Sequence, residues 1–138
     1  MNKQQKDVAE FHKAIGQLEP NIPTKCSEKT ALLRLKLIFE EFTELCEALG
    51  FSGISGRDFD PKRQDLVECA DAIADLLYVT YGTANALGID IEPVWDEVQR
   101  SNISKMKDGY RRKDGKFMKG PGYSPADIEP IIRKQMEG

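Results

Sequence analysis

The feature that most constrains the fold is a long segment, residues 63–87, that is apolar at helical spacing on nearly every side. The uncharged residues on its two sides are Leu66, Ala70, Ile73, Leu77 and Ala84, and Val79, Gly82 and Ala86. A helix with this pattern is a central helix that other helices cover. Glu68, Asp71 and Asp75 share one of its faces at i, i+3 and i+7. We therefore expect these carboxylates to point towards packed protein and not towards bulk water.

The segment before it predicts a second long helix with acids on one side. Ser27 is a suitable N-cap, and Gly50 follows the last residue, Leu49. The apolar stripe consists of Leu35, Ile38, Phe39, Phe42, Leu45, Cys46 and Leu49, and the acids are Glu40, Glu41, Glu44 and Glu47. Taken alone, this is an amphipathic helix with a solvated acidic face. Leu33 and Leu37 lie in line with the acids, however, and this indicates burial on both sides.

The remaining segments predict shorter helices and no strand. Residues 5–18 have helical spacing, Asp90 caps a helix that reaches about Ser104, and Ser124-Pro125 opens a short C-terminal helix. The glycine-rich stretch 50–61 and the polar stretch 105–123 are predicted loops. The sequence therefore predicts one all-α domain over residues 1–138, a helical bundle of four to five helices with a modest core.

Composition narrows the class of function. Hydrophobic residues make up 40% of the chain and charged residues 31%, and the net charge is −3. Nothing in this balance favours nucleic acid or an anionic membrane. The N-terminal residues lack the apolar core of a signal peptide, and no run is long enough to span a bilayer. The odd cysteine count and the lack of CxxC predict reduced thiols in a cytoplasmic protein and argue against a zinc site.

The acids on the two long helices predict a metal site. Buried like charges repel, and such carboxylates are tolerated only when protonated, paired or neutralised by a metal. The few cations of these helices, Arg34, Lys36 and Arg63, lie near the helix ends. Carboxylates without imidazole or thiolate suit Mg²⁺, with Mn²⁺ as a substitute. A di-iron bundle needs Glu-x-x-His on two helices, and the single histidine, His12, is expected at the surface or its boundary.

The stretch 105–123, in contrast, is rich in cations and glycine. The cations in and just before it are Arg100, Lys105, Lys107, Arg111, Arg112, Lys113, Lys116 and Lys119. Cations together with accessible backbone amides suit phosphate oxygens, although a mobile basic tail has the same composition. Nucleic-acid binding is disfavoured because aromatic residues are few. An acidic metal pocket and a basic loop together predict metal-dependent hydrolysis of a phosphate ester or anhydride, with a carboxylate as base.

Two stretches resemble a known superfamily. The run "EEFTEL" followed by "VECADAIADLLYVTYGTANALGID" resembles the all-α nucleoside triphosphate pyrophosphohydrolases, which include MazG-like proteins, dimeric dUTPases and phosphoribosyl-ATP pyrophosphohydrolases. The tail "EVQRSNISKMKDGYRRKDGKFMKGPGY" is similar to that of a MazG-like subgroup, and the resemblance covers about Phe11 to Asp127. It implies hydrolysis of a nucleoside triphosphate at the α-phosphorus, giving the monophosphate and pyrophosphate, with Mg²⁺, in a homodimer or homotetramer.

The resemblance also implies roles for particular residues. The family motif is E-E-x-x-E and then E-x-x-D. It makes Glu41 and Glu44 the expected catalytic residues, and Glu40, Glu41, Glu44 and Asp75 the expected metal ligands or water-activating base. Asn102 and Lys105 of "SNISK" are expected to meet the triphosphate or sugar. The further substrate-binding candidates, taken from the basic tail, are Arg112, Lys113, Lys116, Lys119 and Tyr123.

The chain departs from the family motif at one position. Ala72 stands where the family has a glutamate, three residues before Asp75. Glu68-x-x-Asp71 offers an intact motif one turn earlier. We therefore expect Asp75 and Asp71 as metal ligands, with Glu68 as an outer ligand.

The substrate and the class of function remain open at this point. The resemblance favours dUTP or other pyrimidine or non-standard nucleotides, with phosphoribosyl-ATP as the main alternative. Because Ala72 replaces a carboxylate, a non-catalytic nucleotide-binding helical module is the alternative of another class. A bundle whose acids are merely a solvated surface is the third possibility.

Overall fold

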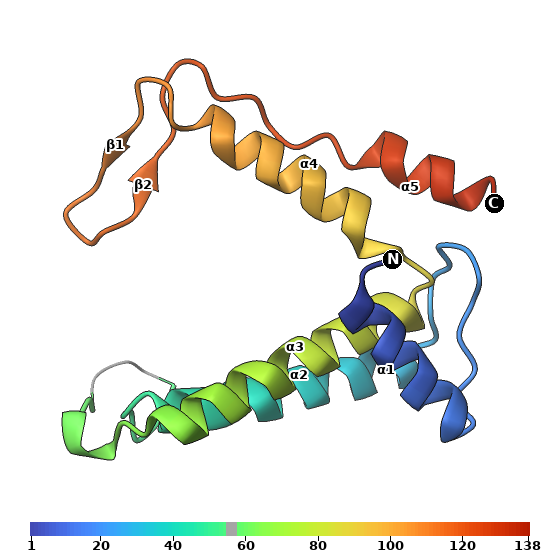
Figure 1. The fold of residues 1–138 in the computed structure, drawn as a ribbon, viewed down its shortest axis with the longest axis horizontal. Helices are drawn as coiled ribbons and strands as arrows, with labels where there is room; N and C mark the ends of the chain where they lie inside the picture. Colours follow the sequence, from blue (N-terminus) through green and yellow to red (C-terminus); the bar gives the residue numbers. More distant parts are fainter. Residues whose placement is uncertain (55–57) are drawn as a thin grey trace.

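The computed structural model describes residues 1–54 and 58–138 (Figure 1). The elements in chain order are α1 (Lys3–Ala14), α2 (Glu28–Ala48), a 3-10 turn η1 (Pro61–Arg63), α3 (Leu66–Ala86), α4 (Ile91–Ser104), β1 (Tyr110–Arg111), β2 (Phe117–Met118) and α5 (Glu129–Met136). The prediction of an all-α fold is confirmed. The loop predicted over 50–61 contains residues 55–57, which lie outside the described residues. Within the described ranges, no helix is both long and apolar enough to cross a membrane.

Side-chain caps set the bounds of the two long helices. The Ser27 side chain accepts a hydrogen bond from the Thr30 N–H at 3.2 Å, which confirms the predicted start of α2. Helix α3 begins at Leu66, later than predicted, because the carboxylate of Asp65 caps the N–H groups of its first turn. It ends before Gly88, where φ is +67° and an added Cβ would lie 2.2 Å from the Ile22 carbonyl oxygen. Only glycine fits this close turn.

Three predictions about the shorter elements are wrong. Helix α1 ends at Ala14 instead of residue 18, because Gly16 turns to a φ of +76°. The basic stretch is not entirely a loop, since Tyr110 pairs with Met118 and Arg111 with Phe117 in an antiparallel β-ribbon. Helix α5 begins at Glu129 and not at Ser124, because the residues in between are held in an extended path beside α4.

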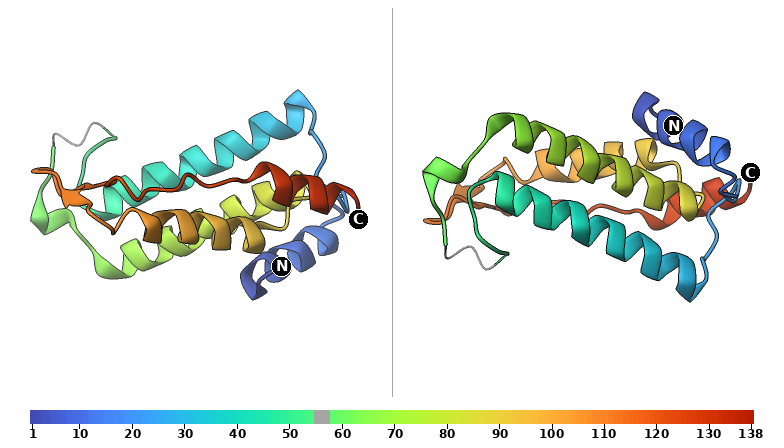
Figure 2. Two further views of the ribbon diagram at one scale, coloured as in Figure 1. Left: turned by 90° about the horizontal axis from the view of Figure 1, so that it is seen from above. Right: turned by 90° about the horizontal axis from the view of Figure 1, so that it is seen from below.

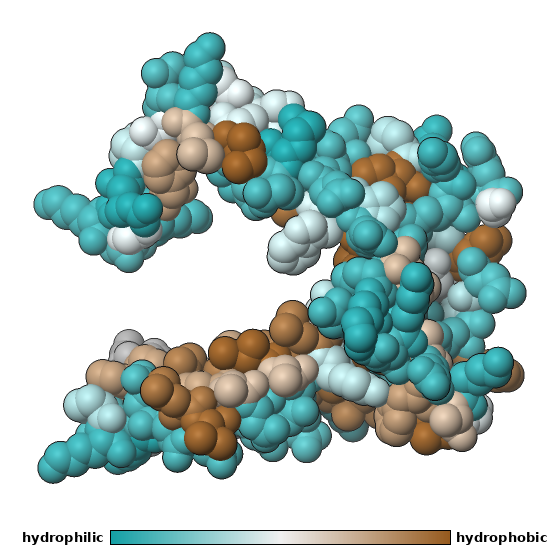
Figure 3. Space-filling model, viewed as in Figure 1, coloured by the Kyte–Doolittle hydropathy of each residue, from teal (hydrophilic) through white to brown (hydrophobic). Residues whose placement is uncertain are grey.

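The helices form two units with different surroundings. Helices α2 and α3 make an antiparallel hairpin, and α1 packs on α3. We call the segment α4, β-ribbon and α5 the arm; it runs along the length of the hairpin (Figure 2). Figure 3 shows an open hollow between the two units, with apolar side chains along its hairpin side. A single chain therefore leaves a broad apolar face of the hairpin uncovered.

The buried core is correspondingly small. Its largest cluster lies in the hairpin seam, where Ala48, Cys69 and Ala72 are buried with Leu45 packed against them. The other buried apolar residues of the described chain are Val8, Ala84 and Ala86. The larger apolar side chains of the two helices remain exposed, among them Leu35, Phe39, Phe42, Ile73 and Leu77, at 42–64% of their surface. The modest core predicted from the chain length is thus only partly built within one chain.

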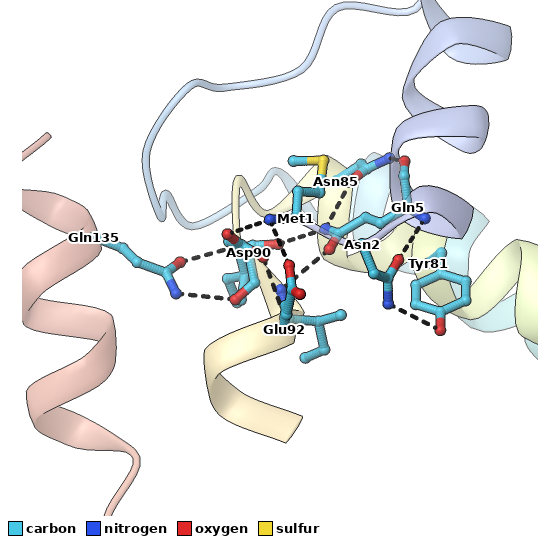
Figure 4. A network of polar contacts seen from close by, with 10 residues as sticks. Met1, Asn2, Gln5, Tyr81, Asn85, Asp90, Glu92 and Gln135 are labelled. Atoms are coloured by element: carbon cyan, nitrogen blue, oxygen red, sulfur yellow. Dashed lines mark hydrogen bonds and ion pairs between the residues drawn. The ribbon is translucent and has the colours of Figure 1, made fainter. Parts of the chain in front are cut away.

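A buried polar junction fixes where the arm leaves the hairpin (Figure 4). Gln5 is fully buried, and its Nε2 donates to Asn85 Oδ1 at 2.8 Å and to the Ile89 carbonyl oxygen at 2.7 Å. Its Oε1 accepts from the Ile91 N–H at 3.1 Å, and Asn85 Nδ2 returns a bond to the Gln5 carbonyl oxygen. Gln135 of α5 pairs with both backbone groups of Asp90 at 2.9 Å. These bonds join α1, α3, α4 and α5 at one point.

Candidate metal site and phosphate-binding arm

Three carboxylates from the two hairpin helices come together. Glu41 and Glu44 of α2 and Asp75 of α3 each offer an oxygen, and these oxygens lie within 4.8 Å of one another. Glu41 and Glu44 are neighbours on the helix surface because they are three residues apart. Asp75 faces them because α2 and α3 run in opposite directions. We call these residues the acid cluster.

The acid cluster carries an uncompensated carboxylate. Glu41 Oε2 is buried and has no hydrogen-bond partner among the described residues. Burial raises the pKa of Glu41, and the negative charges of Glu44 and Asp75 raise it further. None of the ion pairs in the described part of the chain includes a member of the cluster. A divalent cation would satisfy the orphaned oxygen, and an all-carboxylate donor set fits Mg²⁺ or Mn²⁺.

The other predicted ligands lie outside this cluster. Glu40 is exposed on α2, and Glu68 and Asp71 are exposed on α3. The expectation that all three acids of α3 point into packed protein is therefore wrong for Glu68 and Asp71. The reason is that α2 covers only the seam of α3, and these two carboxylates flank the seam.

An acidic pocket next to the acid cluster also contains the exposed carboxylates of Glu68 and Asp71. Its volume is about 510 Å³, and Glu44, Glu68, Asp71, Ala72 and Arg63 are in its wall. Glu44 thus belongs both to the acid cluster and to this pocket. Because Ala72 is part of the wall, a glutamate there would extend into the space beside Glu44. At position 72 the chain therefore lacks the carboxylate of the family motif, whereas the acids Glu44, Glu68 and Asp71 remain in the wall of the same pocket.

The predicted substrate-binding residues lie on the arm. Asn102 is exposed and Lys105 half-buried near the end of α4, and the cations of the β-ribbon region are exposed: Arg112, Lys113, Lys116 and Lys119. The Tyr123 ring is covered by ammonium groups, with Lys119 Nζ 4.5 Å and Lys105 Nζ 5.7 Å from its centroid. The β-ribbon lies across the hollow from the hairpin (Figure 1). Within one chain, the arm that carries these cations is thus separated by the hollow from the hairpin that carries the acid cluster.

Two buried residues were not identified as important by the sequence. His12 is only 5% exposed, which contradicts its expected place at the surface, because α1 packs on α3 and its Nδ1 pairs with Glu19 Oε1. Arg34 is also 5% exposed. The signal for Arg34 was its position seven residues before Glu41, which places both on the side of α2 that faces α3.

The part of the chain that forms this geometry matches a known protein family. The phosphoribosyl-ATP pyrophosphohydrolase family matches residues 8–102, which include the acid cluster and end before the β-ribbon. A comparison with curated proteins finds no match. The family match supports nucleotide pyrophosphohydrolase activity in general, that is, hydrolysis of a phosphoric anhydride. The chain belongs to the phosphoribosyl-ATP pyrophosphohydrolase family, within the all-α nucleoside triphosphate pyrophosphohydrolase superfamily.

Proposed function

We propose that this chain is a Mg²⁺-dependent nucleoside triphosphate pyrophosphohydrolase. The reaction is attack of water on the α-phosphorus, which yields a nucleoside monophosphate and pyrophosphate. The observation that carries the proposal is the buried, unpartnered oxygen of Glu41 within a cluster of three carboxylates. The family match over residues 8–102 supports the reaction class.

The burial of each acid suggests its role. Glu41 and Asp75 are half-buried in the seam and would hold the metal through fixed oxygens. When bound there, Mg²⁺ supplies charge for the phosphate oxygens and acidifies the attacking water. Glu44 is exposed between the cluster and the acidic pocket, so it can accept the proton from that water and release it to solvent. Glu40, Glu68 and Asp71 flank this site and would act as outer ligands.

The cations of the arm would bind the triphosphate, and we propose that a second copy supplies them. These cations belong to the end of α4 and the β-ribbon region, which lie across the hollow from the α2–α3 hairpin that carries the acid cluster: Lys105, Arg112, Lys113, Lys116 and Lys119. Phe42 and Leu77 belong to an uncovered apolar face, and burying such a side chain fully is worth about 1.5–3 kcal/mol. A homodimer or homotetramer that covers this face would bring an arm to another chain's acids.

The substrate is proposed to be a nucleoside triphosphate such as dUTP or another pyrimidine or non-standard nucleotide. The resemblance of the basic tail to a MazG-like subgroup supports this choice. Phosphoribosyl-ATP is a second candidate, and the family match favours it. Both substrates present a triphosphate to the same metal and cations.

Product analysis tests this proposal. The purified protein is incubated with a panel of nucleoside triphosphates, deoxynucleoside triphosphates and phosphoribosyl-ATP, with Mg²⁺ or with EDTA. We expect monophosphate and pyrophosphate with Mg²⁺ only, and the fastest substrate identifies the preferred base and sugar. Saturable nucleotide binding without any product would instead assign a non-catalytic binding module.

A further inference from the structure

A second polar cavity lies at the start of α2, away from the acid cluster. Its volume is about 350 Å³. Polar side chains in its wall include Gln17, Lys25, Ser27, Thr30 and Arg34. Lys25 and Arg34 are its only ionisable side chains apart from a cysteine thiol, and no carboxylate lines it within the described residues. In a chain with net charge −3, this wall is suited to an anion.

Arg34 is the central feature of this cavity. Its side chain is only 5% exposed, and its Nε is buried without a hydrogen-bond partner in the described part of the chain. The guanidinium reaches α3 at Gly82, where an added Cβ would lie 3.2 Å from Nη2. Burial lowers the pKa of Arg34, and the charge of Glu19 opposes this only in part. Glu19, whose charge acts on Arg34, is itself paired with His12 Nδ1, and no salt bridge among residues 1–54 and 58–138 includes Arg34.

The N-terminus of α2 adds donors to the same cavity. The first N–H groups of a helix have no partner within the helix, and they carry partial positive charge. Ser27 and Thr30 of this N-terminus line the cavity, and the Ser27 side chain accepts from the Thr30 N–H. Lys25, which precedes them, is exposed in the same wall. The cavity is thus lined by a guanidinium, an ammonium group and two hydroxyls, and such donors suit a phosphate.

The cavity is separate from the acid cluster but lies along the same seam. Arg34 precedes Glu41 by seven residues, which is two helical turns or roughly 10 Å along α2. A nucleotide with a second phosphate far from its triphosphate can span such a distance. Phosphoribosyl-ATP is a compound of this kind, because its second ribose carries a phosphate.

We propose that the cavity lined by Arg34, Lys25 and the first turn of α2 is a binding site for a phosphate group, distinct from the acid cluster. The phosphate is either free inorganic phosphate or the distal phosphate of a substrate. Only the second source rests on the proposed function.

A titration with inorganic phosphate tests the site without any turnover. Phosphate is added at constant ionic strength, without divalent metal, to protein labelled with ¹⁵N. The Arg34 Nε–Hε signal and the backbone amides of Lys25 and Ser27, which line the cavity, are followed by NMR. We expect saturable shifts at these groups. Chloride is titrated in parallel as a control for unspecific anion binding. Chemical-shift changes that increase linearly with phosphate, as they do with chloride, or that occur only in the arm, would overturn the proposal.

Matched variants keep the test independent of folding. Lys25→Gln removes an exposed cation of the cavity, and we expect phosphate affinity to fall about two- to fivefold. Lys36→Gln removes an exposed lysine of α2 that is not in the wall, and it should bind phosphate as the parent does. Equal affinity in the two variants would contradict the assignment.

Kinetics then separate the two sources of phosphate. If the distal phosphate of a substrate binds here, Lys25→Gln raises KM for phosphoribosyl-ATP but not for ATP. If free phosphate is the ligand, both KM values stay unchanged while the NMR shifts persist. Absence of turnover with all substrates, together with saturable shifts, would reject the proposed function and leave the phosphate site standing.

Discussion

The α2–α3 hairpin and the arm are held together in opposite ways. The hairpin rests on a seam of small apolar residues, in which Ala48, Cys69 and Ala72 are buried. The arm rests on polar contacts. These are the buried junction around Gln5 and, at the surface, the pair of Arg100 with Glu97 at 2.7 Å and the Asp127 N–H that donates to Glu97 at 2.9 Å. The hairpin is therefore the rigid part that can fix a metal, and the arm is the part whose position depends on a few bonds.

The two units also carry opposite halves of one chemistry. The acid cluster of the hairpin has no cation paired with it among the described residues. The arm carries lysines and arginines, of which Arg100, Arg112 and Arg133 are paired locally with Glu97, Asp114 and Glu129. The metal and phosphate sites that we propose therefore lie on separate units, and the proposed assembly would bring them together.

Removing the orphaned carboxylate has the largest expected effect. We expect Glu41→Gln to lower pyrophosphate release by about 10²–10⁴-fold, because the metal and the attacking water lose a ligand. In EDTA the same variant should unfold at a higher temperature than the parent, since an unpaired buried charge is gone. Glu10→Gln, an exposed acid on α1, is the control for both assays. A Glu41→Gln protein with parental activity would remove this residue from the site.

The second prediction concerns the apolar face of the hairpin. Phe42→Asp places a charge on that face, so we expect the assembly to weaken roughly tenfold or more and activity to fall with it. Analytical ultracentrifugation measures the change. Met106→Asp, at an exposed apolar position on the arm, is the matched control. If the parent is a monomer at micromolar concentration and is fully active, a second copy is not needed.

The third prediction restores the missing acid of the family motif. Ala72→Glu places a carboxylate beside Glu44 in the acidic pocket, so the metal gains a ligand. We expect metal affinity to rise about tenfold, measured by calorimetry with Mn²⁺. Because Ala72 is buried, we also expect the variant to be less stable than the parent in the absence of metal. Unchanged metal affinity in a folded variant would show that position 72 does not reach the metal.

The smallest expected effects come from pH, and they have opposite signs in the two units. The pKa of Glu41 is raised above its ordinary 4.5, so the folded state binds more protons than the unfolded one. Metal-free protein should therefore lose stability as pH rises from 4.5 through the raised pKa, and Glu41→Gln should abolish this slope. Thermal unfolding in EDTA across this range measures it.

Glu97 on the arm should respond in the other direction. Hydrogen bonds from Arg100 and from the Asp127 N–H lower the pKa of Glu97 to about 2. Its contacts are therefore fully present above pH 4.5 and are lost as pH falls towards 2. The Asp127 amide signal in NMR should shift in that window and stay constant in Glu97→Gln. An amide that titrates near pH 4.5 would show that the Glu97 contacts are absent in solution.

Local chemistry explains what the sequence predicted well. Ser27 and Asp90 cap the helices where they were expected to, because a cap depends only on nearby residues. The all-α class also follows from local periodicity. The sequence predicted six acids as metal ligands, and the structure brings three of them together, Glu41, Glu44 and Asp75. Which acids meet depends on the register between two antiparallel helices, and local sequence does not determine that register.

Contacts between distant residues explain what the sequence did not predict. Ser124 N–H donates to Ser104 Oγ at 2.8 Å, and this bond across twenty positions delays the start of α5. The β-ribbon likewise depends on pairing across a turn. His12 is buried because α1 docks against α3, which its local sequence does not signal.

Hydrolysis of the preferred nucleotide in H₂¹⁸O with Mg²⁺ tests the central claim most directly. Attack at the α-phosphorus predicts monophosphate and pyrophosphate as the products, with ¹⁸O in the monophosphate alone. The reaction should stop in EDTA and in Glu41→Gln. Label in pyrophosphate, a diphosphate product, or full turnover in the Glu41→Gln variant would contradict the account.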